Sequence, residues 1–227
     1  MEILKDIAQN LIAGNDEKVA NLVGQAIEAK LPTVDILDDG LIAGMNVVGD
    51  RFRNHEMFLP EVLLCARAMT AGVALLKPLL IAEEVPSRGK VVLGTVEGDM
   101  HDIGKNLVGI MLEGAGFEVV DLGTDVPAEK FIDTAVAENA SVIGLSALLT
   151  TTMALMKAVV DQVKERGLSE QVKVIVGGAP LSEEFARSIG AQGYAYDAAN
   201  AVEKVLALQV QGISFRVSLG HFWFIAK

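Results

Sequence analysis

The sequence predicts an α/β protein in which an N-terminal four-helix bundle precedes a domain built on a parallel sheet. In the first third of the chain, apolar residues recur with the 3.6-residue period of amphipathic helices. From Lys90 onward, short β-branched runs alternate with helix-like segments. Residues 83–90 (EEVPSRGK) separate the two patterns with turn and linker residues. We therefore expect one domain over residues 1–86 and a second over residues 90–208.

Four helices are expected in the first domain. The first covers about residues 1–13, and the second begins after Asp16, a good N-cap residue. Thr33 is expected to cap the third, and Pro60 fits the first turn of the fourth. Because the connections are short, neighbouring helices should run antiparallel as a small bundle.

The second domain should contain four clear strands and a weaker fifth. The runs KVVLGTV, FEVVDLG, SVIGLSA and VKVIVGG are strand-like, as is the weaker segment 193–196. The segments between and after them are helix-like, at residues 103–114, 128–139, 152–166, 183–189 and 198–208. This alternation predicts a parallel sheet covered on both faces, whose ligands bind at the carboxyl ends of the strands. The tail, residues 209–227, fits neither pattern.

Composition limits the class of function. Of the 227 residues, 51% are hydrophobic, enough for a sizeable core, and the formal net charge is −11, which argues against a nucleic-acid partner. The single cysteine, Cys65, excludes an intramolecular disulfide and suits a reducing compartment. The N-terminus lacks the pattern of a secretory signal, and no apolar run approaches the roughly 20 residues that span a bilayer. A soluble, cytoplasmic protein without a membrane partner is expected.

The loop after the first strand reads DMHDIG and places His101 where a ligand should bind. A surface histidine held by a carboxylate would look the same. For a metal ligand, Asp99 or Asp102 could orient the imidazole through its second nitrogen, and Gly104 allows close approach. The other histidines, His55 and His221, lie in unrelated segments. A metal at His101 must therefore bring most of its ligands with it, as a macrocyclic cofactor does.

Two further strand ends carry residues that suit a large ligand. The loop after the third strand has hydroxyl groups at Ser146, Thr150, Thr151 and Thr152, and the fourth strand ends in Gly177 and Gly178. The hydroxyl groups can bond a buried polar group, and the glycine pair lets a flat group lie against the backbone. Taken separately, the threonines could be helix caps and the glycines a turn.

In combination these motifs resemble the cobalamin-binding domain of B12-dependent methyltransferases. The resemblance rests on a pattern of three parts: Asp99, His101 and Gly104; Ser146 and Leu148; Gly177 and Gly178. The preceding stretch DRFRNHEMFLPEVLLCARAM resembles the helical cap of the same proteins, which include cobalamin-dependent methionine synthase. As far as about Leu208, the chain is similar to the small corrinoid proteins of anaerobic methyltransferase systems.

The resemblance implies a flavodoxin/Rossmann-like domain that holds cobalamin base-off and His-on. His101 would be the lower cobalt ligand, Asp99 its partner, and Thr152 a third member of the relay. Met100, Asp102 and Ile103 would touch the cofactor beside them, and Ser146, Leu148 and Thr150 would line its pocket. For the upper face, the candidates are Phe58, Leu59, Val62 and Met69, which at helical spacing could equally be bundle core.

The implied function is that of a methyl carrier, with methylcobalamin as the loaded state. A donor-specific methyltransferase would load the cobalt, an acceptor methyltransferase would unload it, and a reductive activator would rescue it after oxidation. The chain itself would be a non-catalytic subunit without catalytic residues. A B12-dependent sensor or regulatory protein, a radical mutase subunit and a signalling receiver are the alternatives. Methanol, methylamines, aryl methyl ethers and betaines stay open as methyl donors.

Overall fold

A computed structural model describes residues 2–83 and 87–219, with side chains as far as residue 209. The chain divides into two compact units: Met1–Arg88 with Gly109–Glu118, and Gly89–Val108 with Val119–Lys227. The main division falls inside the expected linker, whose residues 84–86 lie outside the described part. The sequence did not indicate that Gly109–Glu118 would join the first unit. It stays a prediction that residues 1–86 act as a cap domain and residues 90–208 as a cofactor-binding domain.

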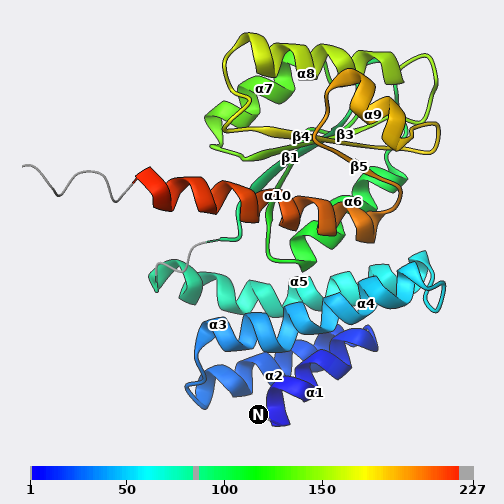
Figure 1. Cartoon of the computed structure of the whole chain (residues 1–227). Helices are drawn as coiled ribbons and strands as arrows, with labels where there is room; N and C mark the ends of the chain where they lie inside the picture. The colour runs from blue at the N-terminus through cyan, green and yellow to red at the C-terminus, as the bar shows by residue number, and fades with distance from the viewer. Residues whose placement is uncertain (1, 84–86, 220–227) are drawn as a thin grey trace, which may run out of the picture. The chain divides into compact units, whose positions relative to one another are not determined.

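The first unit contains the four predicted helical segments (Figure 1). They are α1 (Glu2–Ile12), α2 (Asp16–Glu28), a composite third segment and α5 (Leu59–Ala82). The third segment passes without a break from α3 (Thr33–Asp35) through the π-helical η1 (Ile36–Ile42) into α4 (Ala43–Arg53). Its apolar face is buried with those of the other helices, at Ile7, Leu11, Val23, Leu41 and Leu76.

Two predicted helix caps were wrong. The N-cap of α2 is Asn15, whose side chain accepts the main-chain N–H of Lys18 at 3.2 Å, so Asp16 is already helical. Asparagine and aspartate are equally good caps, so composition could not rank them. Thr33 lies inside the helix that it was expected to cap, and its hydroxyl group donates instead to Glu83 Oε1 at 2.8 Å. Glu83 lies 50 positions away, so no residue near Thr33 in the sequence indicates this hydrogen bond.

Helix α5 begins, as predicted, with a proline in its first turn. In the described part of the chain it is also the one helix long and apolar enough to cross a membrane, which sequence inspection did not anticipate. However, it packs against α2, and its side chains at Val62, Cys65 and Leu76 are buried. A salt bridge of 2.8 Å joins Arg67 of α5 to Asp16. These contacts are those of a bundle helix.

The second unit has the predicted sheet of five strands: β1 (Lys90–Thr95), β2 (Glu118–Asp121), β3 (Val142–Ser146), β4 (Lys173–Gly177) and β5 (Gly193–Ala195). Their order is β2-β1-β3-β4-β5, and β1, β3, β4 and β5 pair in parallel. This is the flavodoxin-like order, in which the chain changes direction between β1 and β3. Thr95, Ser146 and Gly177 lie side by side in register at the carboxyl edge. The predicted fold class is confirmed.

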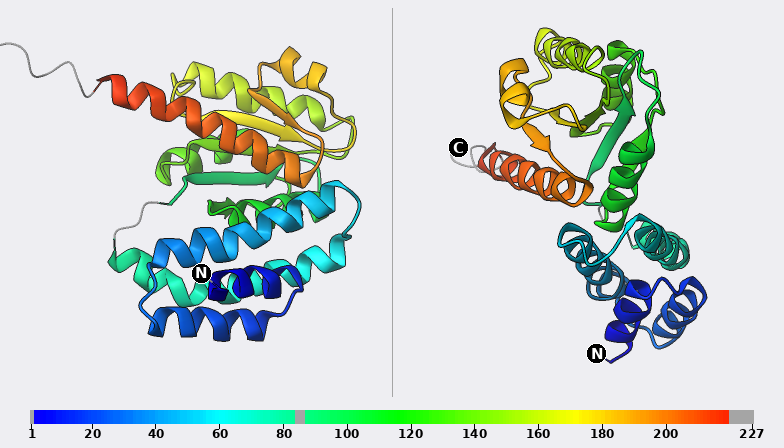
Figure 2. Two further views of the ribbon diagram at one scale, coloured as in Figure 1. Left: turned by 60° about the horizontal axis from the view of Figure 1, so that its bottom comes forward. Right: turned by 90° about the vertical axis from the view of Figure 1, so that its right-hand side faces the viewer.

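Helices cover both faces of this sheet (Figures 1 and 2). Helices α7 (Ala128–Ala137) and α8 (Met156–Glu165), the latter after a short 3-10 turn η2 (Met153–Leu155), lie on one face together with α9 (Glu183–Ile189). Their apolar side chains enclose the core around Phe131 and Ile143. Helix α6 (Ile103–Gly114) follows β1, and α10 (Ala198–Leu219) packs against β4 and β5 on the other face.

The last helix is longer than the sequence predicted. It was expected to end at Leu208, but α10 continues to Leu219 and takes in the first part of the tail. The side-chain amide of Gln209 donates to Ser141 Oγ, just before β3. No proline interrupts this stretch, so the backbone allows the helix to continue. Residues 220–227 of the tail lie outside the described residues.

Candidate functional site

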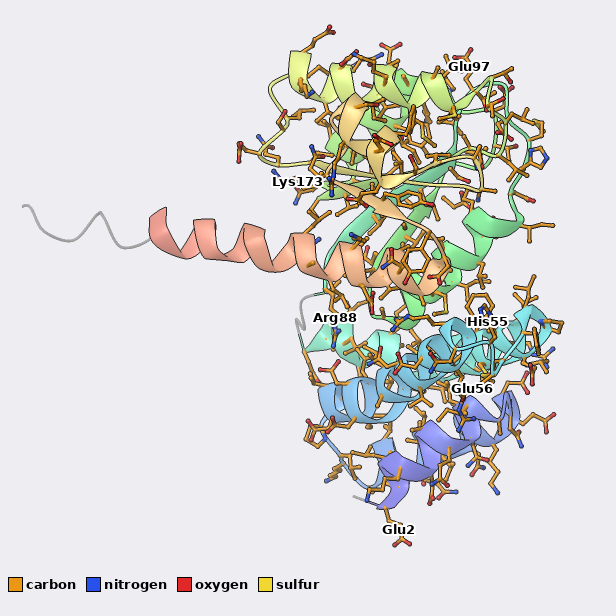
Figure 3. The ribbon with its side chains drawn as sticks, turned by 45° about the vertical axis from the view of Figure 1, so that its right-hand side comes forward. Glu2, His55, Glu56, Arg88, Glu97 and Lys173 are labelled. Carbon is orange, nitrogen blue, oxygen red and sulfur yellow. The ribbon has the colours of Figure 1, made fainter. Side chains whose placement is uncertain are left out.

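The loop after β1 brings His101 into direct contact with Asp99. It begins at the exposed Glu97 (Figure 3). Oδ1 of Asp99 accepts one hydrogen bond from Nδ1 of His101 at 2.7 Å and another from the main-chain N–H of His101 at 3.1 Å. The carboxylate is fully buried, whereas the histidine side chain is 51% exposed. Of the two carboxylates expected to orient the ring, Asp99 is the one that does so; Asp102 is exposed and accepts Asn106 Nδ2 at 3.2 Å.

The second oxygen of Asp99 binds the neighbouring strand end. Oδ2 accepts the main-chain N–H groups of Leu148 and Leu149 at 2.8 and 3.1 Å, and the Thr152 hydroxyl at 2.9 Å. These donors belong to the loop after β3, which lies beside β1 in the sheet. One buried carboxylate therefore joins two strand-end loops. The Thr152 contact has the geometry of the expected relay, whose operation stays a prediction.

The ionisation of Asp99 determines which ring nitrogen of His101 carries the proton in their hydrogen bond. Burial by itself would raise the pKa of Asp99, but hydrogen bonds from His101, from the main chain of Leu148 and from Thr152 hold that pKa well below its usual range. An ionised carboxylate only accepts hydrogen bonds, so the imidazole Nδ1 carries the proton. The lone pair is then on Nε2, the nitrogen that remains available as a ligand atom.

The surroundings of His101 are open and partly apolar. A Cβ at Gly104 would meet no atom within 4 Å outside the backbone of its own helix, so there is open space beside the first turn of α6. Met100 and Ile103 are 70% and 72% exposed, and Leu148 is 42% exposed. These apolar side chains border the histidine from two strand-end loops. Thr150 is exposed and Ser146 half-buried, where a ligand could reach their hydroxyl groups.

The glycine pair after β4 has a structural role that the sequence did not reveal. A Cβ on Gly178 would lie 1.9 Å from the carbonyl oxygen of Ala147, and the φ of Gly178 is +141°, which other residues rarely adopt. A Cβ on Gly177 would lie 3.2 Å from the carbonyl oxygen of Ala195. The close approach of neighbouring strand ends therefore requires a glycine at 178, whereas a side chain at 177 would be only tightly packed, whether or not a flat ligand also contacts the pair.

The four candidates in the first unit differ in exposure. Phe58 is 65% exposed and Leu59 is half-buried, while Val62 and Met69 are buried at 0% and 4% exposure. The burial of Val62 and Met69 agrees with the competing interpretation that they are bundle core. Contact of any of the four with a cofactor stays a prediction.

Comparison with known proteins identifies the family. A sequence profile described as a B12 binding domain matches residues 89–206, and a second profile of the same description matches residues 3–77. The chain belongs to the B12-binding family. Both units thus fall within profiles of this family, and the predicted resemblance is confirmed.

Relatives in the B12-binding family match nearly the whole chain. A corrinoid protein of Desulfitobacterium hafniense is 46% identical over 89% of this chain and 95% of its own length. A dimethylamine corrinoid protein of Methanosarcina barkeri is 48% identical over 91% of this chain and 97% of its own length. Among solved structures, the methanol:cobalamin methyltransferase complex of Methanosarcina barkeri matches with a TM-score of 0.80 and 32% identity, covering 95% of this chain and 84% of the other. The cofactor of the chain is accordingly a corrinoid.

The geometry fits that cofactor. Among the residues that the structure describes, no group of three or more His, Cys, Asp or Glu side chains could hold a metal ion. His101 offers one ligand atom, so a cobalt bound there needs a macrocycle to supply the others. The open space at Gly104 and the exposed side chains of Met100 and Leu148 give a large, partly apolar ligand room beside the imidazole.

Sequence inspection missed two residues that hold the loop around His101. The buried Thr95 donates its hydroxyl hydrogen to the carbonyl oxygen of His101 at 2.8 Å, and Asp125 binds the backbone of the same loop. Thr95 looked like an ordinary strand residue, since its side chain acts on a residue six positions later. Asp125 lies in another loop, and only the pairing of β1 with its neighbour brings the two together.

Thr152→Val should remove the hydrogen bond from the Thr152 hydroxyl to Asp99 Oδ2 while keeping the volume of the side chain. Loss of the hydroxyl donor is expected to lower the free energy of unfolding by about 1 kcal/mol at pH 7. The pKa of Asp99 is lower in the folded protein than in the unfolded chain, so the ionised carboxylate stabilises the folded state at pH values above its ordinary pKa. This stabilisation is lost as the pH falls from the ordinary pKa through the lowered one. The deficit of the variant should therefore shrink on acidification, as measured by urea unfolding at several pH values. A deficit that grows towards low pH would contradict the assignment.

Proposed function

We propose that the protein is a methyl carrier that binds its corrinoid base-off, with Nε2 of His101 as the lower cobalt ligand. The contact between His101 and Asp99 carries this proposal. It holds the proton on Nδ1 and leaves the opposite nitrogen of a half-exposed ring free. When bound, the corrinoid supplies a cobalt that carries a methyl group between two proteins.

The residues of the chain then have separate tasks. His101 provides one axial ligand atom, and Asp99 fixes the tautomer and direction of its ring. Leu148, Leu149 and Thr152 hold the carboxylate in place through three hydrogen bonds. The hydrogen bond between Asp99 and Nδ1 would hold the ring in the direction in which Nε2 can serve as the ligand atom.

The partners in this proposal are methyltransferases. A donor-specific enzyme loads the carrier, a second enzyme takes the methyl group away, and a reductive activator restores oxidised cobalt. Relatives named for dimethylamine, and the methanol:cobalamin methyltransferase complex among the solved structures, support small methylated compounds as donors. A cytoplasmic location suits a carrier that exchanges methyl groups with such enzymes.

Reconstitution tests the carrier role. The purified protein, loaded with cobalamin and chemically reduced, is mixed with dimethylamine or methanol and a thiol acceptor. The mixture contains both a methyltransferase for that donor and an acceptor methyltransferase, one of them, or neither. We expect repeated turnover only when both methyltransferases are present. Repeated turnover by the carrier alone would refute the proposal, because the chain would then activate the donor itself.

A further inference from the structure

Asp125, in the loop between β2 and α7, has a backbone conformation that is uncommon for a residue with a side chain. Its φ is +56°, in the left-handed region, one of four such non-glycine residues among those that the structure describes. Aspartate tolerates this region better than most residues but still at some energetic cost. A strained conformation persists only where the surrounding contacts hold it, and such positions cluster at functional sites.

The contacts that hold Asp125 lead directly to the histidine loop. Oδ1 of Asp125 accepts the main-chain N–H of Gly98 at 2.7 Å, and its own N–H donates to the carbonyl oxygen of Asp99 at 3.0 Å. These two hydrogen bonds run in opposite directions and together form a clamp that holds the consecutive residues Gly98 and Asp99. The left-handed turn at Asp125 is what lets its side chain and its N–H face the same segment.

The clamp is anchored to the sheet. Next to Asp125, the N–H of Val126 donates to the carbonyl oxygen of Thr95 at 3.0 Å, and Val126 forms a parallel bridge with Val96. On the other side of the clamped segment, the N–H of Asp99 donates to the carbonyl oxygen of Val96 at 3.1 Å. The backbone of Asp99 is therefore fixed on both sides, which fixes the direction of a carboxylate that in turn orients His101.

We propose that Asp125 is a positioning residue for the lower cobalt ligand, acting through Gly98 and Asp99 rather than by touching the cofactor. This inference rests on the proposed ligation by His101. Without the clamp, Gly98 can leave its own left-handed conformation, with φ at +78°, because glycine has other accessible states. The backbone of Asp99 is then no longer fixed on both sides, so its carboxylate changes direction more freely. The imidazole that it orients is therefore held less often in the direction that suits ligation.

Two variants separate the side-chain contact from backbone strain. Asp125→Gly tolerates the left-handed conformation but lacks the acceptor oxygen. Asp125→Asn keeps an acceptor at Oδ1 and also tolerates that conformation. Asp125 is exposed, so neither change disturbs the core. Both are made in the full-length protein.

Hydrogen exchange of the Gly98 amide in the cofactor-free protein is the first measurement. It should be up to about tenfold faster in Asp125→Gly and near the wild-type rate in Asp125→Asn. The second is the electron paramagnetic resonance spectrum of the cobalt(II) holoprotein. Asp125→Gly should show a smaller fraction with imidazole nitrogen splitting, and Asp125→Asn should restore that fraction.

The outcomes distinguish the two proposals. Nitrogen splitting that is as complete in Asp125→Gly as in the wild type overturns the positioning role, even if Gly98 exchanges faster, because Asp125 would then be a purely structural residue. Absence of the splitting from the wild-type holoprotein refutes ligation by His101 itself, and the role of Asp125 fails with it. Loss in Asp125→Gly with recovery in Asp125→Asn supports both.

Discussion

Replacing His101 by alanine is expected to abolish the nitrogen splitting that a protein imidazole imposes on the cobalt(II) resonance. Among the described residues around the loops after β1 and β3, no second histidine is present to substitute for it. The ring projects from a loop that Asp99 and Thr95 hold on both sides, so its removal should leave the fold intact. The measurement is the resonance spectrum of the cobalt(II) holoprotein, with circular dichroism as a check on folding.

His55→Asn is the matched control. His55 is exposed on the loop before α5 and has a positive φ of 60°, a conformation that asparagine tolerates (Figure 3). It should leave the spectrum unchanged. Splitting from a protein imidazole that survives in His101→Ala, as distinguished by labelling the protein with nitrogen-15, would show that another histidine binds the cobalt, and the proposed site would be wrong.

Asp99→Asn should destabilise the folded protein by about 3 kcal/mol at neutral pH. The buried carboxylate accepts five hydrogen bonds, from the N–H and the ring of His101, from Leu148 and Leu149, and from Thr152. An amide offers only one acceptor oxygen, and its NH₂ group would face donors that have lost their partner. The free energy of unfolding in urea is the quantity to measure. Cobalt ligation should weaken less than in His101→Ala, since the imidazole is still present.

Asp102→Asn provides a comparison on the same loop. Asp102 is exposed, and its side chain accepts one long hydrogen bond from Asn106, so this change should alter the free energy of unfolding by less than about 0.5 kcal/mol. Equal effects of the two substitutions would mean that the hydrogen-bond network around Asp99 contributes little to stability.

The order of elements could be predicted from the sequence because its signals are local. The helical period of apolar residues in 16–31 and the β-branched run KVVLGTV each report on a single element, as does Pro60 in the first turn of a helix. The N-cap of α2 was predicted wrongly because Asn15 and Asp16 are adjacent and nearly equivalent caps. The length of α10 was predicted wrongly because the tail shows no clear helical pattern of apolar residues, yet the helix continues to Leu219.

For the site, the sequence by itself determined that Asp99, His101, Thr152 and the glycine pair lie at strand ends, because each motif directly follows a strand-like run. Only the tertiary structure decided which carboxylate faces the imidazole, that Thr152 reaches Asp99, and that Gly178 is required by the carbonyl of Ala147. The role of Asp125 likewise depends on β2 lying beside β1, whereas Thr95 binds a residue of the loop that follows its own strand. The hydrogen bonds of this site act over about 3 Å between residues up to 53 positions apart, and strand pairing alone brings such residues within reach.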